Sequence, residues 1–430
     1  MKERRSGRSV LIRGGASLSG EVRVPPSKSY SHRALICSAF SNGKSKIENI
    51  SLCDDSMATV SVLSGMGAKI EIESETAFVH GTLPIEPENV LCCEESASTL
   101  RMCLPLAASQ DFFSVFTGEG SLLKRPVGPI LEALSSLGVE VMSRGGYVPV
   151  AIESKGFASD GVRISASSGS QHVSGLLLSS PLSKNGIKID IADEMVSKPY
   201  VDLTVSVMRR FGVAVERKGY KIFEVRPGQS YKGINLEVPG DYSSASFLIA
   251  AALSARSNIS LLGLPQEKMP DSQVLDLMRS FGADLMFESG KLLVSGKELR
   301  SIEVDCKDMP DLVPPLVVVA LRAEGTTRIR GVSRLSTKES SRVQALISEF
   351  SKMGGKLRLD GEDLIINQSG RLRGCKVSSW GDHRIEMALA SAALGAEGET
   401  VIVDAMKTSK SYPGFYDDLA HLGAEIDARQ

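Results

Sequence analysis

The sequence predicts an α/β fold made of six repeat units, and two recurring patterns support this prediction. One pattern is an amphipathic helix that ends in a large apolar residue and Gly and is followed by a short strand. The other is a helix of small and apolar residues, followed by a turn and a strand. The two patterns alternate six times along the 430 residues. A period sustained over six copies is typical of a repeat architecture.

The amphipathic pattern recurs at a nearly constant spacing of 69 to 74 residues, measured between its glycines. Gly readily adopts the left-handed conformation that ends many helices. We therefore expect an amphipathic helix to end just before each of these positions. They are Gly67, Gly138, Gly212, Gly282, Gly354 and Gly423.

The second pattern predicts helices that are buried on all sides, because their residues are apolar nearly all round. Each helix is followed by a turn that usually carries Gly or Asn, and then by a β-like run. The six copies occupy residues 33–50, 101–116, 173–191, 244–262, 312–331 and 386–403.

The composition excludes several functional classes. Charged residues make up 23% of the chain and the formal net charge is −1, whereas nucleic-acid-binding proteins usually have a strong basic excess. No apolar run reaches the roughly 18 residues of a membrane span, and the start of the chain lacks the apolar segment of a signal peptide. The seven scattered Cys have no CxxC spacing, so we expect neither disulfides nor a metal site, and a cytoplasmic location.

Polar side chains are concentrated at the expected helix starts, as in "PPSKSYSHRAL" (25–35). If the units pack about a common axis, the helix N-termini converge and offer N–H groups and positive dipole ends to one space. The cations there would suit a small ligand with several negative charges, and Asp311 and Glu339 are candidates for proton transfer. These cations are Lys28, Arg33, Arg125, Lys338, Arg342, Arg384 and Lys410.

Nine stretches in order along the chain carry a family resemblance. They are "PPSKSYSHRAL", "KRPVGPILEAL", "SGSQHVSGLLL", "VSKPYVDLT", "GDYSSASFLIAAA", "MPDLVPPL", "STKESSRVQAL", "GDHRIEMALA" and "SKSYPGFYDDL". Over essentially its whole length the chain resembles the 5-enolpyruvylshikimate-3-phosphate (EPSP) synthase family.

The resemblance implies a two-domain inverse α/β barrel with three βαβαββ-type units in each domain and substrates in the interdomain cleft. One domain would comprise residues 1–24 and 240–430, and the other residues 25–239. The implied enzyme transfers the enolpyruvyl group of phosphoenolpyruvate to the 5-hydroxyl of shikimate 3-phosphate by addition and elimination, releasing phosphate. It would use no cofactor and no metal, act as a monomer and be inhibited by glyphosate.

The resemblance also implies roles for individual residues. Asp311 would take the proton from the 5-hydroxyl, and Glu339, aided by Lys28, would protonate the enol methylene. The shikimate 3-phosphate pocket would consist of Lys28, Ser29, Arg33, Gly169, Ser170, Gln171, Ser197, Tyr200, Asp311 and Lys338. The phosphoenolpyruvate pocket would consist of Lys28, Ala97, Arg125, Gln171, Arg342, Arg384 and Lys410.

The chain departs from the family pattern in four places. Gly169 replaces a frequent Ser, so one phosphate contact would come from the backbone. Arg334 replaces the usual Asn. In "ESASTLR" (95–101), Glu95 replaces Asn and Ala97 replaces a Gly that lies beside phosphoenolpyruvate. We expect the Ala97 methyl group to lower the sensitivity to glyphosate.

Two other functions remain open at this stage. A UDP-N-acetylglucosamine enolpyruvyl transferase would have a nucleophilic Cys where this chain has Gly120. A non-catalytic repeat protein that binds a phosphorylated metabolite would need the cations but not the two carboxylates. Single residues also have structural alternatives: Asp311 as a helix cap, Lys338 and Glu339 as an exposed pair, and His383 as a buried structural histidine.

Overall fold

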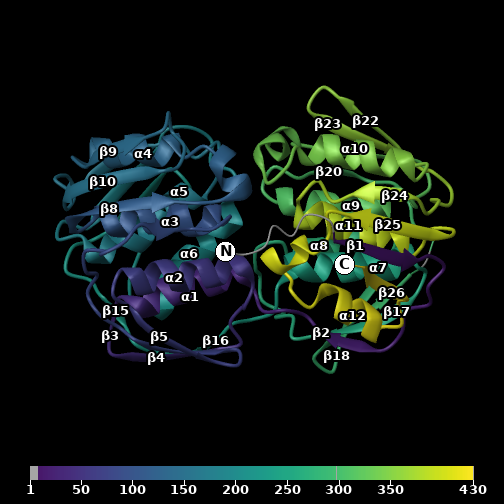
Figure 1. Ribbon diagram of the computed structural model, residues 1–430, viewed down its shortest axis with the longest axis horizontal. Helices are drawn as coiled ribbons and strands as arrows, with labels where there is room; N and C mark the ends of the chain where they lie inside the picture. Colours follow the sequence, from purple (N-terminus) through teal and green to yellow (C-terminus); the bar gives the residue numbers. More distant parts are fainter. Residues whose placement is uncertain (1–7, 297, 430) are drawn as a thin grey trace. The chain divides into compact units, whose positions relative to one another are not determined.

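The computed structural model describes residues 8–296 and 298–429 and divides into two compact units. Unit 1 contains the N-terminal segment up to Pro25 and the chain from Gly240 onward, and unit 2 contains Pro26–Pro239. In Figure 1, unit 2 runs from purple to teal, and unit 1 combines the purple N-terminal strands with the green and yellow half of the chain.

Six four-stranded sheets share one topology, in which a parallel pair of strands is extended by two further strands in antiparallel pairing. Unit 2 contains β16(Asn235–Glu237)-β4(Lys44–Glu48)-β6(Thr76–His80)-β5(Lys69–Glu73), β7(Leu91–Cys92)-β8(Asp111–Thr117)-β10(Val150–Lys155)-β9(Glu140–Ser143) and β11(Gly161–Ile164)-β12(Ile187–Ile191)-β14(Ile222–Val225)-β13(Glu216–Lys218). The short strands β15(Tyr231–Lys232) and β3(Ser41–Asn42) pair separately.

The sheets of unit 1 include the N-terminal strands of the chain. They are β24(Lys376–Ser378)-β25(Glu399–Val403)-β1(Ser9–Arg13)-β26(Ile426–Arg429), β18(Asp284–Glu288)-β19(Lys291–Ser295)-β17(Asn258–Leu262)-β2(Glu21–Arg23) and β20(Glu303–Asp305)-β21(Thr326–Arg330)-β23(Asp363–Asn367)-β22(Lys356–Asp360). Strand β1 pairs antiparallel with β25, from Ser9 opposite Val403 to Arg13 opposite Glu399, and Figure 1 shows the purple β1 beside β25. The N-terminal segment thus completes two sheets of unit 1.

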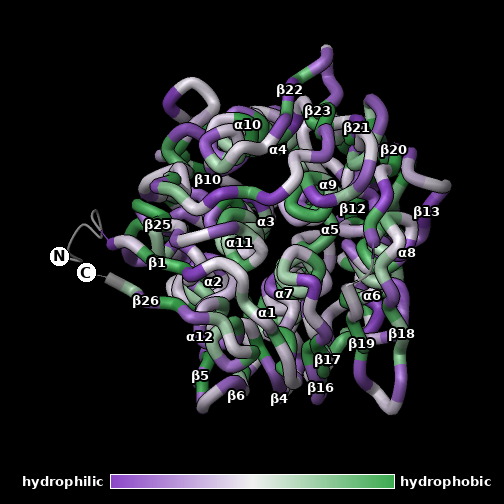
Figure 2. The backbone as a smooth tube through the Cα atoms, turned by 90° about the vertical axis from the view of Figure 1, so that its right-hand side faces the viewer, coloured by the Kyte–Doolittle hydropathy of each residue, from purple (hydrophilic) through white to green (hydrophobic). Residues whose placement is uncertain are grey.

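Each repeat contributes one buried helix to the core. These helices are α1(Lys28–Ala39), α3(Ala97–Ala108), α5(Gln171–Ser179), α7(Tyr242–Ser254), α9(Val313–Ala320) and α11(His383–Ala393). In unit 2, α5 packs against α1 and α3, and in unit 1, α7, α9 and α11 pack against one another. Every residue of α7, α9 and α11 is buried, and the tube of α9 is mainly green in Figure 2. The predicted buried helices are confirmed.

The second helix of each repeat ends two residues before its predicted glycine, as expected. The six helices are α2(Asp54–Gly65), α4(Gly128–Ser136), α6(Lys198–Arg210), α8(Val274–Ser280), α10(Arg342–Lys352) and α12(Phe415–His421). The φ angles of the six predicted glycines lie between +86° and +104°. Only glycine adopts such values without strain.

Short 3₁₀ helices occur between the longer elements. They are η1(Gly120–Lys124), η2(Ser180–Leu182), η3(Pro310–Leu312), η4(Ser333–Thr337) and η5(Lys407–Lys410). Two of them, η3 and η5, carry the predicted site residues Asp311 and Lys410. The seven cysteines all lie among the described residues; none of them forms a disulfide, and five are buried. Among the described residues, no helix has both the length and the hydropathy to cross a membrane.

Candidate active site

In unit 2, the first candidate cation is Lys28, the first residue of α1. Ser27 caps this helix by accepting a hydrogen bond from the Tyr30 amide at 3.4 Å. The Lys28 ammonium lies 2.7 Å from a carboxylate oxygen of Asp55, and the two side chains are only 15% and 6% exposed. Asp55 lies in the first turn of α2 and was not predicted as a site residue. The pairing fixes the position of the ammonium at the N-terminal end of α1.

Arg33 lies one turn further along α1 and is 1% exposed. Its guanidinium donates to the carbonyl oxygens of Ser29 and Tyr200 at 2.7 and 3.0 Å. It also donates to the hydroxyls of Thr204 and Ser174 at 2.7 and 3.3 Å. Burial lowers the pKa of Arg33 to about 10. Arg33 therefore ties α1 to α6 and holds two predicted ligand residues, while its direct contact with a ligand stays a prediction.

The start of α5 is joined to the start of α3 by Gln171. Its amide nitrogen donates to the Ser98 hydroxyl at 2.8 Å, and its amide oxygen accepts from Arg101 at 2.8 Å. Arg101 also donates to the Pro126 carbonyl at 2.9 Å, next to Arg125, which is 7% exposed. This network places Gln171 and Arg125, both predicted ligand residues, near one another.

The start of α6 has an unusual backbone at Ser197, which caps the helix with φ +55° and ψ +41°. A left-handed conformation is uncommon for a residue other than glycine, and such strain is concentrated at functional sites. Tyr200 follows in the first turn, and its amide donates to the Ser197 carbonyl at 3.1 Å. Gly169 and Ser170, the latter 3% exposed, precede α5. The predicted shikimate residues of unit 2 thus lie at the starts of α1, α5 and α6.

Glu95 turns toward η1. Its carboxylate accepts hydrogen bonds from the amide and the hydroxyl of Ser121, at 3.0 and 2.8 Å. Gly120 makes this approach possible, because a Cβ there would lie 2.5 Å from the carboxyl carbon of Glu95. Ala97, the first residue of α3, is 3% exposed. Whether its methyl group touches a ligand stays a prediction.

In unit 1, Arg342 is the centre of the candidate site. It is 1% exposed and begins α10. Its guanidinium lies 2.8 Å from Asp311, 2.6 Å from Glu339 and 2.8 Å from Asp382. A buried arginine requires such partners, since an unpaired buried charge is costly. Lys338 and Glu339 precede the helix and are not an exposed pair, because their side chains are 20% and 9% exposed.

Asp311 lies among three cations. Its carboxylate is 2.8 Å from Arg342, 3.2 Å from Arg384 and 3.6 Å from Lys338. Burial by itself would raise the pKa of Asp311, but Arg384, Lys338 and Arg342 together hold it well below its usual value. The cap of α9 is Leu312, with no side-chain cap hydrogen bond. Asp311 is therefore an ionised carboxylate held by cations rather than a helix cap.

The start of α11 organises the remaining cations of unit 1. Asp382 is fully buried, caps the helix by accepting from the Arg384 amide at 2.9 Å, and pairs with Arg342. Arg384 donates to the Ser243 hydroxyl at 2.7 Å. His383 is 1% exposed, with its Nδ1 atom 3.7 Å from a carboxylate oxygen of Asp382, which agrees with a structural histidine.

Two further cations complete the description of unit 1. Lys410 is the last residue of η5 and is 8% exposed. Arg334 lies in η4 and donates to the Lys307 carbonyl at 3.2 Å, and burial lowers its pKa. The structure thus brings together Asp311, Lys338, Glu339, Arg342 and Arg384 in unit 1. Sequence reasoning missed Asp382 and Ser243 as their partners, and Asp55 as the partner of Lys28, although Asp382 precedes two named residues in "GDHR".

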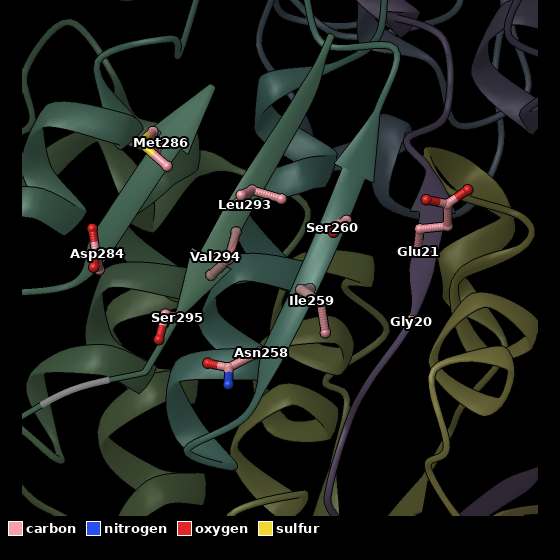
Figure 3. A pocket seen from close by; sticks show the side chains of 10 residues that line it. All are labelled: Gly20, Glu21, Asn258, Ile259, Ser260, Asp284, Met286, Leu293, Val294 and Ser295. Carbon is pink, nitrogen blue, oxygen red and sulfur yellow. The ribbon is translucent and has the colours of Figure 1, made fainter. Parts of the chain in front are cut away.

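One cavity of unit 1 has no part in this cluster. It has a volume of about 510 Å³ and lies over strands β2, β17, β18 and β19. Figure 3 shows its lining, in which Asn258, Met286 and Glu21 come from different strands of one sheet. None of the predicted site residues lines it, so it is not the candidate active site.

Comparisons with known proteins agree on one family. The family model "EPSP synthase (3-phosphoshikimate 1-carboxyvinyltransferase)" matches residues 12–419. A 3-phosphoshikimate 1-carboxyvinyltransferase of Methanocella arvoryzae is 39% identical over 95% of this chain and 97% of its own length. The protein of that name from Thermococcus kodakarensis is 40% identical over 96% and 100%.

Solved structures show the same fold. The EPSP synthase of Acinetobacter baumannii has a TM-score of 0.84 to this chain and is 25% identical, with 99% of this chain and 100% of that chain covered. The match over most of the chain and the identity to full-length relatives lead to one conclusion. The chain belongs to the EPSP synthase family.

Proposed function

We propose that the protein transfers the enolpyruvyl group of phosphoenolpyruvate to the 5-hydroxyl of shikimate 3-phosphate and releases phosphate. The observation that carries this proposal is the carboxylate of Asp311, held within 3.6 Å of Arg342, Arg384 and Lys338. A general base beside several cations suits a reaction in which a hydroxyl attacks an anionic substrate. Membership of the family supports the same reaction.

Shikimate 3-phosphate is assigned to the helix starts of unit 2, together with Asp311 and Lys338. Lys28 and the α5 and α6 starts offer an ammonium, N–H groups and hydroxyls for its phosphate. Its carboxylate and ring hydroxyls complete the same pocket. The assigned residues of unit 2 are Lys28, Ser29, Arg33, Gly169, Ser170, Gln171, Ser197 and Tyr200.

Phosphoenolpyruvate is assigned to Lys28, Arg125 and Gln171 of unit 2, and to Arg342, Arg384 and Lys410 of unit 1. Arg342 and Arg384 are already paired with carboxylates. The anionic substrate consequently competes with Asp311 and Glu339 for these guanidiniums, and its binding frees both carboxylates for proton transfer.

Two carboxylates divide the proton transfers. Asp311 is ionised because its pKa lies well below the usual value, and its oxygen accepts the proton of the 5-hydroxyl as the C–O bond forms. Glu339 lies 2.6 Å from Arg342; in its protonated form, once the substrate has displaced it from this guanidinium, it delivers its proton to the methylene carbon and takes one back in the elimination. The proton held by Asp311 leaves with the phosphate. Lys28 stabilises the negative charge of both substrates during these steps.

The structure around η1 argues against the alternative function as a UDP-N-acetylglucosamine enolpyruvyl transferase. A side chain at Gly120 would collide with the Glu95 carboxyl, whose carbon lies 2.5 Å from the Cβ position. A Cys at this place would thus require the carboxylate of Glu95 to leave Ser121. The binding-protein reading gives no role to Asp311 and Glu339 as a pair. We also propose a cytoplasmic monomer that glyphosate inhibits weakly.

A phosphate-release assay tests the proposed function. The enzyme is incubated with phosphoenolpyruvate and either shikimate 3-phosphate or UDP-N-acetylglucosamine. We expect phosphate release with shikimate 3-phosphate only. Release with the nucleotide sugar would favour the rival transferase, and binding of both ligands without any release would favour the binding protein.

A further inference from the structure

Glu386 is a buried carboxylate that the proposed reaction does not use. It lies in the first turn of α11, two residues after Arg384, and is fully buried. Buried carboxylates are rare without partners, because removing the charge from water is costly. Glu386 therefore requires hydrogen-bond donors in its surroundings.

The partners of Glu386 lie in the segment that carries Lys410. One carboxylate oxygen accepts from the Met406 amide at 2.7 Å, and the other accepts from the Lys407 amide at 2.7 Å. The hydroxyl of Tyr416, from α12, donates to the first oxygen at 2.8 Å. The carboxylate thus receives three hydrogen bonds, two of them from the cap and the first residue of η5.

The backbone at this point needs such support. Met406 caps η5 with φ +69° and ψ +23°. This left-handed backbone conformation is uncommon for residues other than glycine. The N–H of Met406 and that of Lys407 both point at one carboxylate, as in a small anion-binding nest. The negative charge of Glu386 at the start of η5 also stabilises the partial positive charge of the N–H groups there.

We propose that Glu386 is a positioning residue for Lys410: its carboxylate holds the strained start of η5, so that the ammonium four residues beyond Met406 stands ready for phosphoenolpyruvate. The proposal rests on the proposed function, since Lys410 is assigned to that substrate there. It adds a role for a residue that is assigned to neither substrate.

The ionisation of Glu386 makes the arrangement sensitive to pH. Burial raises the pKa of Glu386 to about 7, although the hydrogen bonds from Tyr416, Lys407 and Met406 lower it. As the pH falls below about 7, the carboxyl gains a proton and becomes a weaker acceptor for the two amides. The hold on η5 is therefore strongest above pH 7 and weakens toward pH 6.

Other ionisable groups lie on the elements around Glu386, and most of them are paired with partners other than Glu386. Lys407 and Tyr416 act on it directly, and α9 has no ionisable side chain. Tyr242 of α7 donates to the Pro265 carbonyl. On β1 and β25, Arg13 pairs with Glu399. On α10, Arg342 and Glu349 are paired with other residues. On α11 itself, His383 adjoins Asp382.

The test compares the parent enzyme with Glu386→Gln, which keeps the shape but cannot ionise. We expect the KM for phosphoenolpyruvate to rise about tenfold at pH 8, or about 1.4 kcal/mol, with a smaller change in kcat. The kcat/KM of the parent divided by that of Glu386→Gln should fall as the pH is lowered, with a midpoint near pH 7. Taking the ratio cancels the titration of the substrate phosphate, which lies near pH 6.

A merely structural role for Glu386 would lower thermal stability without a selective change in this KM or a pH-dependent ratio. That result would overturn the proposal while leaving the proposed function intact. A parent enzyme without activity toward the two substrates would instead refute the proposed function. Tyr416→Phe removes only one of the three hydrogen-bond donors and leaves the charge of Glu386 in place. It should raise the KM for phosphoenolpyruvate about two- to threefold, which is less than the effect of Glu386→Gln.

Hydrogen exchange in the parent enzyme provides a measurement that does not depend on a variant folding. The amides of Met406 and Lys407 should exchange slowly at pH 8. After correction for the intrinsic pH dependence, their protection should decrease between pH 8 and pH 6. Constant protection across this range would contradict the proposal.

Discussion

Asp311→Asn separates the chemical role of this carboxylate from a structural one. Asparagine keeps the size of the side chain and one acceptor oxygen, but it cannot take the proton of the 5-hydroxyl. We expect kcat to fall at least about a hundredfold, the lower end for a general-base contribution. This corresponds to about 2.7 kcal/mol in the activation free energy.

The geometry predicts an opposite effect on binding. Arg342, Arg384 and Lys338 lie 2.8, 3.2 and 3.6 Å from the Asp311 carboxylate. Two unit charges about 4 Å apart near a protein surface interact by roughly 4 kcal/mol. Removing the carboxylate releases part of this attraction for an incoming anion. The KM for phosphoenolpyruvate should therefore stay the same or decrease while kcat falls.

Stability gives a second readout of the same substitution. The pKa of Asp311 is held well below its ordinary value of 3.8 in the folded state. Such a carboxylate stabilises the fold above its unfolded pKa, and this contribution disappears as the pH falls through the folded pKa. The difference in unfolding free energy between parent and Asp311→Asn should thus be largest at neutral pH and shrink below about pH 4.

Steady-state kinetics and calorimetric titration with shikimate 3-phosphate check these expectations. The control is Glu303→Gln, which removes an exposed carboxylate from β20 that pairs with Arg330 and should leave kcat unchanged. A normal kcat in Asp311→Asn would refute the role of general base. A reduced kcat together with lost ligand binding would show that Asp311 acts by maintaining the structure.

Three further predictions concern both units. Lys28→Ala should nearly abolish turnover and weaken the binding of both substrates by about 2–5 kcal/mol. It removes one ammonium and leaves the charge of Asp55 beside the anions. Turnover within threefold of the parent would refute this prediction. Ala97→Gly should tighten inhibition by glyphosate tenfold or more, about 1.4 kcal/mol, with a smaller change for phosphoenolpyruvate; equal inhibition would show that the methyl group does not line the pocket. Shikimate 3-phosphate should reduce the radius of gyration in small-angle scattering, because a dianion relieves repulsion between the cations of the two units; an unchanged radius would count against closure.

The repeat architecture could be predicted from the sequence because its signals are local. A glycine at each helix end and an apolar helix in each repeat depend only on neighbouring residues, and all six predicted glycines adopt positive φ. The inclusion of β1 and β2 in unit 1 required the family resemblance, because strand pairing such as Ser9 with Val403 joins distant segments.

The candidate site could be predicted only in part. The residue types were evident from motifs, but their partners come from other repeats. Sequence reasoning expected an external anion near Lys338 and Arg342, whereas the structure places the protein's own Asp311 between them. The direction of Glu95 was likewise set by a contact with Ser121, 26 residues further along the chain.

The most direct test of the proposed reaction is to observe its product. Phosphoenolpyruvate and shikimate 3-phosphate are incubated with the enzyme in heavy water and followed by proton and phosphorus NMR. The account predicts vinyl signals of an enolpyruvyl ether at the 5-position, stoichiometric inorganic phosphate and deuterium in the methylene group, all formed at least about a hundredfold more slowly by Asp311→Asn. Phosphate release without the ether, or ether formation that persists unchanged in this variant, would contradict it.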